Sequence, residues 1–257
     1  MLEGKRIIVT GAARGMGEAT LSAYVSAGAD VVAMDINDEL GQDVVQRAGD
    51  SGPGSASYCH VDVADSDSVE AAFSQAVAQL GGLDALAHPA AIQAASDAGS
   101  VAVEHWDTMF AVNVRGTMLT NQAAYPYLKA AGGGSIINFG SISGQRAEPG
   151  AVAYSAAKGA VHSWTRSAAA AWGNDRVRVN AILPAMATPM YTEAMSKLSE
   201  DEKTAAYWMN HQSIALGHQY GDPLNDLGPV MVFFASDASG FITGQLIPVD
   251  GGQTNTR

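Results

Sequence analysis

The sequence holds one cysteine, few cations and no long apolar run. A lone Cys59 excludes an internal disulfide and a cysteine-rich metal site, and we predict no metal centre. The 14 Lys and Arg residues against 26 Asp and Glu leave a net charge of −12, which disfavours nucleic acid and anionic membrane surfaces as partners. No apolar stretch reaches the ~18 residues of a membrane span, and the first residues do not resemble a secretory signal. We therefore expect a cytoplasmic protein.

Small and apolar residues are what the chain has in quantity. Apolar types make up 47% of its 257 residues, and 28 residues are glycine, which suits a closely packed enzyme rather than a disordered chain. We find no internal repeat, and no linker rich in proline, glycine or serine divides the sequence. Length and composition together predict one domain over residues 1–257 with a sizeable core.

A glycine-rich turn follows the first apolar run. Residues 6–10 are typical of a buried parallel strand, residues 11–17 (Gly-Ala-Ala-Arg-Gly-Met-Gly) form the turn, and a helical pattern follows. A second strand over 30–34 ends at Asp35. Such glycines let the backbone approach a pyrophosphate at a helix N-terminus, and a carboxylate about 20 residues later can accept hydrogen bonds from the adenosine ribose. The unit predicts a dinucleotide site, and a plain glycine turn is the less favoured interpretation.

The same rhythm continues to the end of the chain. Strand-like runs recur at 57–61, 83–88, 135–139, 177–183 and 245–249, and helical patterns fill the intervals. Alternating strands and helices favour a parallel sheet with helices on both faces. We predict a doubly wound, Rossmann-like α/β fold with seven parallel strands.

Tyr154 and Lys158 are four residues apart in a segment with a helical pattern. That spacing places both side chains on one face of a helix. A phenol with its ordinary pKa of about 10 is a poor base at neutral pH, and a nearby ammonium lowers that pKa. The pair is therefore a candidate acid–base couple. Taken alone, it is also compatible with a Tyr and a Lys that share a helix face by chance.

With these segments in view, the chain resembles the short-chain dehydrogenase/reductase family over essentially its full length. The family's TGxxxGxG pattern is matched by Thr10, Gly11, Gly15 and Gly17, its catalytic four by Asn113, Ser141, Tyr154 and Lys158, and its last strand end by Asp250-Gly251-Gly252. The resemblance implies that Tyr154 exchanges a proton with the substrate oxygen and that Lys158 depresses the Tyr154 pKa and binds the nicotinamide ribose. It further implies that Ser141 orients the substrate and that Asn113 holds a water.

The resemblance also implies a set of cofactor contacts, with Asp62 and Val63 at the adenine ring. The set is Gly11, Arg14, Gly15, Met16, Gly17, Asp35, Asp62, Val63, Ala90, Tyr154, Lys158, Pro184 and Thr188. Asp35 would repel a 2′-phosphate and favours NAD, whereas Arg14 lies where NADP-using relatives often place a base. We predict NAD, because Asp35 is at the ribose itself and Ile36, Asn37 and Asp38 offer no cation.

Two segments depart from the family pattern. His88-Pro89-Ala90-Ala91 replaces the usual Asn-Asn-Ala-Gly, so that Pro89 offers no backbone N–H and Ala91 replaces a glycine beside the cofactor. We interpret His88 as a packed strand-end residue rather than a catalytic one. Pro184-Ala185 replaces the usual Pro-Gly, which leaves open which backbone group would bind the carboxamide.

Residues 188–220 leave the strand–helix rhythm and hold Met and aromatic residues. By resemblance this segment is a substrate lid, and its apolar side chains favour a neutral, apolar substrate of alicyclic, terpenoid or steroid-like type. Packing of these residues onto the lid's own body or onto a neighbouring subunit is an equal alternative. The candidate substrate contacts are Ser143, Met186, Met190, Tyr191 and Trp208.

The leading hypothesis is an NAD(H)-dependent oxidoreductase that interconverts a secondary alcohol and its ketone. An NADPH-linked biosynthetic ketoreductase and a catalytically silent nucleotide-binding regulator are the alternatives. An epimerase or dehydratase of the family's longer branch is disfavoured by the three residues between the first two loop glycines. Relatives usually form homotetramers, so a homo-oligomer is expected, with a tetramer favoured and a dimer possible.

Overall fold

The computed structural model describes residues 1–50 and 52–254, and within them every side chain except those of Met190, Ala194, Trp208 and Met209. Seven parallel strands form one sheet, as predicted, and their order is β3-β2-β1-β4-β5-β6-β7. The strands are β1 (Arg6–Thr10), β2 (Asp30–Asp35), β3 (Ser55–His60), β4 (Ala85–His88), β5 (Gly134–Phe139), β6 (Val177–Pro184) and β7 (Leu246–Val249). Each begins and ends within two residues of the predicted run.

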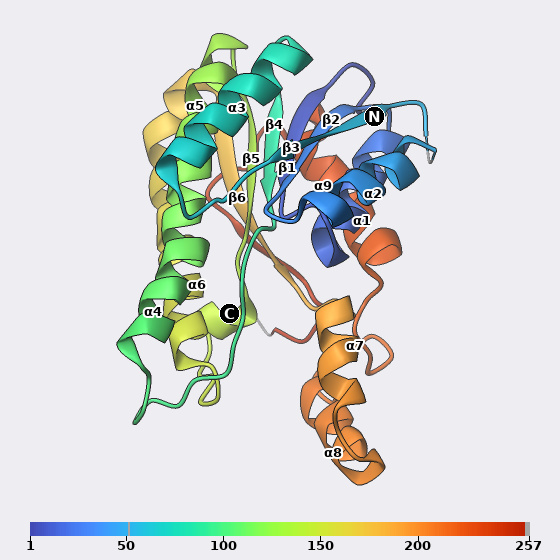
Figure 1. The fold of residues 1–257 in the computed structure, drawn as a ribbon, viewed down its shortest axis with the longest axis vertical. Helices are drawn as coiled ribbons and strands as arrows, with labels where there is room; N and C mark the ends of the chain where they lie inside the picture. Colours follow the sequence, from blue (N-terminus) through green and yellow to red (C-terminus); the bar gives the residue numbers. More distant parts are fainter. Residues whose placement is uncertain (51, 255–257) are drawn as a thin grey trace.

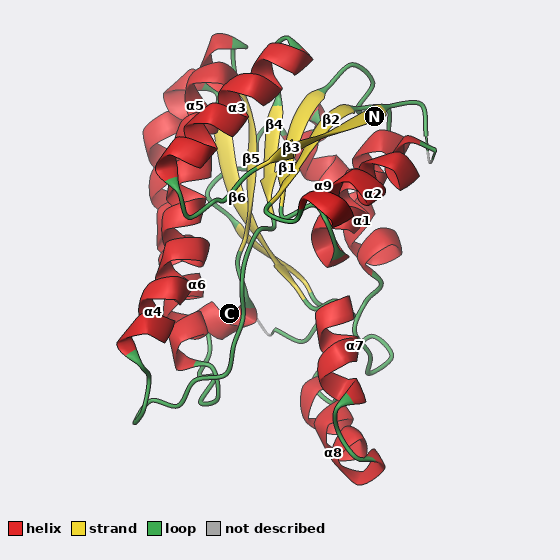
Figure 2. Ribbon diagram, in the orientation of Figure 1, coloured by secondary structure: helices red, strands yellow, loops and turns green. Residues whose placement is uncertain are grey.

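Helices cover both faces of the sheet (Figures 1 and 2). One face carries α1 (Gly15–Ser26), α2 (Asp38–Gly49) and α9 (Gly228–Ala235), whose buried side chains, among them Leu21, Tyr24 and Phe234, form one core cluster with the strands. The other face carries α3 (Ser66–Leu80), α5 (Gly116–Ala130) and α6 (Val152–Trp172), with Phe73 and Leu128 in the second cluster. Burial of an apolar layer on each face stabilises the strands, which are apolar on both sides.

The strand order reverses direction between β1 and β4. From β1 the chain builds outward through β2 and β3, and it then crosses to β4 and builds the other half of the sheet. Connections on the two sides of such a switch point run to opposite faces, so a crevice opens at the carboxyl ends of β1 and β4. The loops that follow these two strands carry the glycine turn and residues 89–91.

The helical segment over 103–130 includes a π-helical turn that the sequence pattern does not predict. Helix α4 (Val103–Phe110) continues into a π-helical turn (Ala111–Arg115) and then into α5. Asn113 lies in the middle of that turn. An inserted π turn rotates the residues it contains relative to the rest of the helix, and such turns are frequent at functional sites.

Two further helices, α7 (Pro189–Ser196) and α8 (Glu200–His211), project beyond the carboxyl end of the sheet (Figure 1). They occupy the segment predicted to leave the strand–helix rhythm. A parallel bridge between Met186 and Gly221 closes the base of this excursion. Within the described residues, every helix is too short or too polar to cross a membrane.

Candidate functional site

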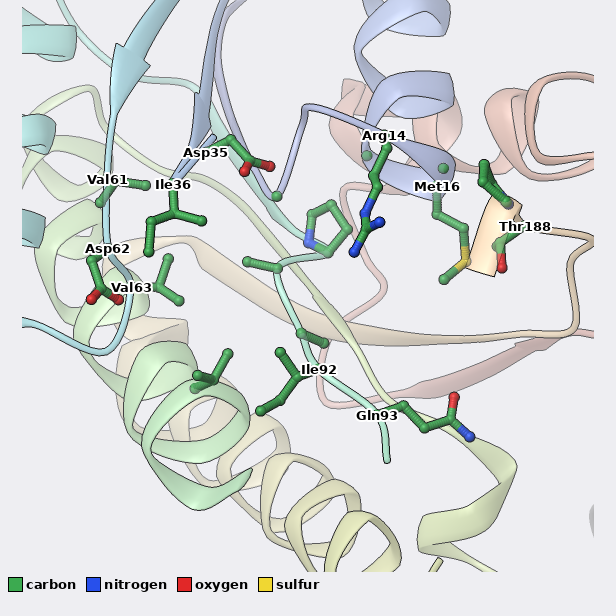
Figure 3. A pocket seen from close by; sticks show the side chains of 18 of the residues that line it. Arg14, Met16, Asp35, Ile36, Val61, Asp62, Val63, Ile92, Gln93 and Thr188 are labelled. Atoms are coloured by element: carbon green, nitrogen blue, oxygen red, sulfur yellow. The ribbon is translucent and has the colours of Figure 1, made fainter. Parts of the chain in front are cut away.

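A pocket of about 370 Å³ lies at the crevice between β1 and β4, and we call it the main pocket. Its lining comes from the glycine turn after β1, from the ends of β2 and β3, from residues 89–93 after β4, and from α6 and the start of α7 (Figure 3). The volume is in the range of ordinary small-molecule sites. Segments far apart in the sequence thus meet at the switch point.

Most of the predicted cofactor residues line the main pocket. They are Gly11, Arg14, Gly15, Met16, Gly17, Asp35, Asp62, Val63, Ala90, Tyr154 and Thr188. Among the described residues, Lys158 and Pro184 belong to the prediction but not to the lining: Lys158 is buried next to Tyr154, and Pro184 ends β6. Residues that line the pocket without having been predicted as contacts are Ile36, Val61, Pro89, Ala91, Ile92, Gln93, Val112 and Pro189.

The glycine turn brings backbone against backbone at one side of the pocket. Gly11 has a φ of 59°, and a Cβ added to it would lie 2.6 Å from Ala90 Cα. Gly15 has a φ of 61°, and a Cβ added to it would lie 3.7 Å from Pro189 Cδ. Helix α1 begins here without a side-chain cap on its first N–H groups. Such groups can bind an anion, so the turn fits a pyrophosphate.

Asp35 and Arg14 place opposite charges on the pocket wall. The Asp35 carboxylate accepts hydrogen bonds from the Ala13 and Asn37 backbone N–H groups, each at 3.0 Å. These bonds fix the carboxylate at the end of β2, beside the turn. Arg14 points into the pocket in Figure 3 and is the single basic residue among the described residues of its lining. The carboxylate fits a ribose diol, whereas it would repel a phosphate at the same place.

Apolar side chains gather on the side of the pocket that is away from α7. Ile36, Val61 and Val63 face one another in Figure 3, at the ends of β2 and β3. Ile36 is 63% exposed, which is unusual for an isoleucine and places an apolar wall at the pocket mouth. A flat aromatic ring such as adenine fits between walls of this kind. The signal that could have identified Ile36 is its position directly after the acidic strand end.

His88 lies behind the pocket rather than in it. Its side chain is buried at the end of β4, and Nδ1 lies 2.7 Å from Thr10 Oγ1 and 3.2 Å from Thr120 Oγ1. Burial and the nearby Lys158 cation lower the pKa of His88 to about 3, so the imidazole is neutral. The packed interpretation of this residue agrees with that geometry.

Asn113 uses its side chain to hold the chain segment that follows β4. Its Oδ1 accepts a hydrogen bond from Ile92 N–H at 2.9 Å, and its Nδ2 donates to Ile92 O at 2.8 Å. Ile92 lines the main pocket. The buried amide thus fixes the pocket wall.

Ser141, Tyr154 and Lys158 meet at the carboxyl end of β5. Ser141 lies two residues after the strand end, and its hydroxyl accepts a hydrogen bond from Ser143 N–H at 3.1 Å while also bonding Tyr154. Tyr154 and Lys158 share one face of α6, and the Lys158 ammonium lies 5.6 Å from the centroid of the Tyr154 ring. The same ammonium donates a hydrogen bond to Phe139 O at 2.7 Å.

The pKa of Tyr154 is shifted in the direction opposite to the one we expected. Burial raises the pKa of Tyr154, and the hydrogen bond with Ser141 opposes that rise. Burial also lowers the pKa of Lys158 to about 8. The physical reason is desolvation, which disfavours the charged form of each group, while the ammonium is held by Phe139 O. In this arrangement the phenol is protonated.

The predicted substrate residues divide into three groups. Ser143 and Met186 are buried at the edge of the sheet, and Met186 belongs to the core cluster. Tyr191 packs within its own segment: its hydroxyl lies 2.8 Å from His211 Nε2, and its ring meets Tyr220 edge to face. The side chains of Met190 and Trp208 lie outside the described part of the structure. Packing of the segment onto itself accounts for Tyr191.

Comparison with known proteins gives full-length matches. The family model described as Enoyl-(Acyl carrier protein) reductase matches residues 11–254. The 2,5-dichloro-2,5-cyclohexadiene-1,4-diol dehydrogenase of Sphingobium indicum is 37% identical over 98% of each chain. The D-threitol dehydrogenase of Mycolicibacterium smegmatis is 36% identical over 98% of this chain and 94% of its own. A solved short-chain type dehydrogenase/reductase from Mycobacterium marinum has a TM-score of 0.89 at 30% identity, covering 99% of this chain and 97% of the other.

Proposed function

The chain belongs to the short-chain dehydrogenase/reductase family, and from that premise we propose that it interconverts a neutral secondary alcohol and its ketone with NAD(H). Oxidoreductases of this family act on CH–OH groups with a nicotinamide cofactor. The observation that carries the proposal is the meeting of Ser141, Tyr154 and Lys158 beside the main pocket. A nucleotide-binding regulator would have no use for these three side chains together.

In the proposed mechanism the chain's own residues handle the proton. NAD, when bound, supplies the acceptor for the hydride that leaves the carbinol carbon. Ser141 Oγ donates a hydrogen bond to the substrate oxygen and holds it near Tyr154. In reduction, Tyr154 Oη donates its proton to the carbonyl oxygen and becomes a phenolate. In oxidation, the phenol first loses its proton to solvent, and the resulting phenolate takes the hydroxyl proton of the substrate. Lys158 stabilises the phenolate once its ammonium turns from Phe139 O towards the phenol oxygen.

We propose NAD rather than NADP because of the fixed position of Asp35. Its carboxylate is held by two backbone N–H groups and cannot swing away from a 2′-phosphate without losing both bonds. The Asp35 carboxylate and a bound 2′-phosphate would be two negative charges in close contact, and such charges repel strongly in a partly desolvated pocket. Arg14 lies on the opposite side of the turn and fits the pyrophosphate as well as it fits a 2′-phosphate.

For the substrate we propose a neutral alcohol with an apolar or cyclic skeleton, as we expect from the sequence. We further propose that this substrate carries a second hydroxyl group. The two curated relatives named above are described as dehydrogenases of a chlorinated cyclohexadiene diol and of D-threitol. We further propose that residues 188–220, with α7 and α8, form the lid over that substrate. Thr188 and Pro189 already border the main pocket, which supports that role.

We also propose a homo-oligomer, with a tetramer favoured over a dimer. A shallow hollow of about 780 Å³ lies over α4, α5 and α6, and Phe110, Val161 and Trp164 are among the residues that line it. Apolar hollows of this size are commonly covered in oligomers. Light scattering of the purified protein measures the assembly state directly.

The NADPH-linked ketoreductase remains the second candidate, because Arg14 lies in the pocket and the matching family model is described as Enoyl-(Acyl carrier protein) reductase, which names an acyl-carrier-protein substrate. Nicotinamide absorbance with NAD and NADP separately, across neutral diols, cyclic alcohols and anionic acyl thioesters, distinguishes the two. The proposal expects turnover with NAD and the neutral set. Preference for NADPH and the thioesters supports the alternative, and cofactor binding without turnover on any substrate supports the silent regulator.

A further inference from the structure

His162 lies one helical turn after Lys158 on α6 and directly beneath the Ser141 turn. It is 2% exposed, and its Nε2 accepts a hydrogen bond from the Ser141 backbone N–H at 3.3 Å. The proposed mechanism above assigns this residue no task. A buried histidine that holds the backbone of the serine next to Tyr154 is in a position to influence the reaction without touching the substrate.

The imidazole ring is enclosed by the two ends of the Ser141 turn. A Cβ added to Gly144 would lie 2.7 Å from His162 Cε1, and one added to Gly140 would lie 2.9 Å from Cδ2. Only residues without a side chain let the backbone approach the ring this closely. The turn therefore packs directly against the imidazole ring, and the size and position of the ring set the position of Ser141.

The protonation state of His162 suits the acceptor role. Burial, together with the Lys158 and Arg166 cations one turn away on either side, lowers the pKa of His162 to about 4. The ring is therefore neutral at physiological pH. A neutral imidazole whose Nε2 accepts a hydrogen bond carries its proton on Nδ1.

We propose that His162 is a positioning residue for the reaction, which holds the Ser141 backbone so that the Ser141 hydroxyl meets Tyr154 and the substrate oxygen. The inference rests on the proposed function, because it names the residue that fixes one of its three active groups. The connection runs from His162 Nε2 through the Ser141 N–H to the Ser141 hydroxyl, which is hydrogen-bonded to Tyr154. A small displacement of such a group is enough to slow a reaction severely.

His162→Gln and His162→Asn form a matched pair of variants. The glutamine amide oxygen is as many bonds from Cβ as Nε2 is, so it can accept the Ser141 N–H, whereas the asparagine oxygen is one bond too short. We expect kcat to fall about 10- to 100-fold in His162→Asn and to stay within about threefold of wild type in His162→Gln. The dissociation constant of NAD should be unchanged in both, because His162 does not line the main pocket.

A double substitution tests whether the effect passes through Ser141. If it does, His162→Asn added to Ser141→Ala should lower kcat by less than about threefold beyond Ser141→Ala alone. Equal kcat in the Gln and Asn variants, or effects that multiply in the double variant, would overturn the proposal. Amide hydrogen exchange at Ser141 gives a readout without turnover: protection is kept with Gln and lost with Asn. That measurement decides the inference even if wild-type protein oxidises no alcohol, an outcome that would refute the proposed function alone.

Discussion

The Lys158 ammonium lies 5.6 Å from the centroid of the Tyr154 ring, and it donates its hydrogen bond to the Phe139 carbonyl oxygen. The cation is buried, and burial lowers the pKa of Lys158 to about 8. Helical spacing places the two side chains on one face of α6. The direction of the ammonium group is set by its hydrogen bond to the Phe139 carbonyl oxygen at the end of β5. The pair is therefore held in an arrangement that has to change before the cation can stabilise a phenolate.

Lys158→Met should change how stability depends on pH. The pKa of Lys158 in the folded state is about 8, below the ordinary value of about 10.4, so the unfolded chain binds more protons between these values. The wild type should thus gain stability relative to the variant, by up to about 3 kcal/mol, as the pH rises from about 8 to about 10. Urea unfolding of both proteins across that window measures the difference. A difference in unfolding free energy that stays constant across this pH range would show that burial does not lower the pKa of Lys158.

Asp35→Ala and Asp35→Asn should move cofactor preference towards NADP. Either change removes the negative charge that opposes a 2′-phosphate, and we expect the ratio of kcat/KM with NADP to that with NAD to rise at least about tenfold, or about 1.4 kcal/mol. Asparagine keeps an oxygen for the Ala13 N–H, so it should preserve the turn better than alanine does. Asp43→Ala makes the same change of charge on the exposed face of α2 and should leave the ratio unaltered. An unchanged ratio in the Asp35 variants would remove Asp35 from cofactor selection.

Gly11→Ala should weaken cofactor binding through a steric clash. The new Cβ would lie 2.6 Å from Ala90 Cα, so the turn or the segment after β4 must move. Gly4→Ala is a matched control, since Gly4 has a similar φ of 71° and open space around its Cβ position. Both substitutions should cost about 1 kcal/mol of stability for the positive φ, and Gly11→Ala alone should weaken NAD binding, as calorimetry would measure. Equal NAD affinity in both variants would contradict this assignment of the turn.

Asn113→Ala should loosen the pocket wall. It leaves the Ile92 N–H and C=O without their partner, which should cost about 2 to 3 kcal/mol of unfolding free energy and raise KM for NAD. Asn121→Ala removes a buried amide that pairs with Asn138, outside the lining of the main pocket. That control should lose comparable stability with KM for NAD unchanged. Parallel changes in KM in both variants would mean that Asn113 has no specific effect on the pocket.

Strand and helix periods predicted the architecture because the centre of the sheet is buried on both faces and its strands, such as β1 and β4, are apolar runs. The start of β3 was missed by two residues because it is an edge strand whose first residues, Ser55 and Ala56, are exposed or half-buried. The π-helical turn at Asn113 has no signature in periodicity, and both the turn and α4 pack against α6, which is distant in sequence.

The candidate site was predictable to the extent that motifs mark it. The turn glycines, Asp35 and Tyr154 line the main pocket as expected. Gln93 could not be predicted as a contact, because a loop side chain joins a pocket only through tertiary packing. The direction of the Tyr154 pKa shift depends on burial and on the direction of the Lys158 ammonium, and neither is encoded in their spacing. His162 was overlooked because a lone histidine on a helix has no motif.

The Tyr154→Phe variant is the sharpest test of the proposed chemistry. Its kcat with NAD should be measured on the neutral alcohol or diol that the wild type turns over best, beside Tyr127→Phe, which makes the same change on α5. We expect a loss of about 10³-fold in Tyr154→Phe, an NAD dissociation constant within about threefold of wild type, and an unaffected Tyr127→Phe. A Tyr154→Phe protein that keeps more than about a tenth of the wild-type kcat would show that the phenol does not transfer the proton.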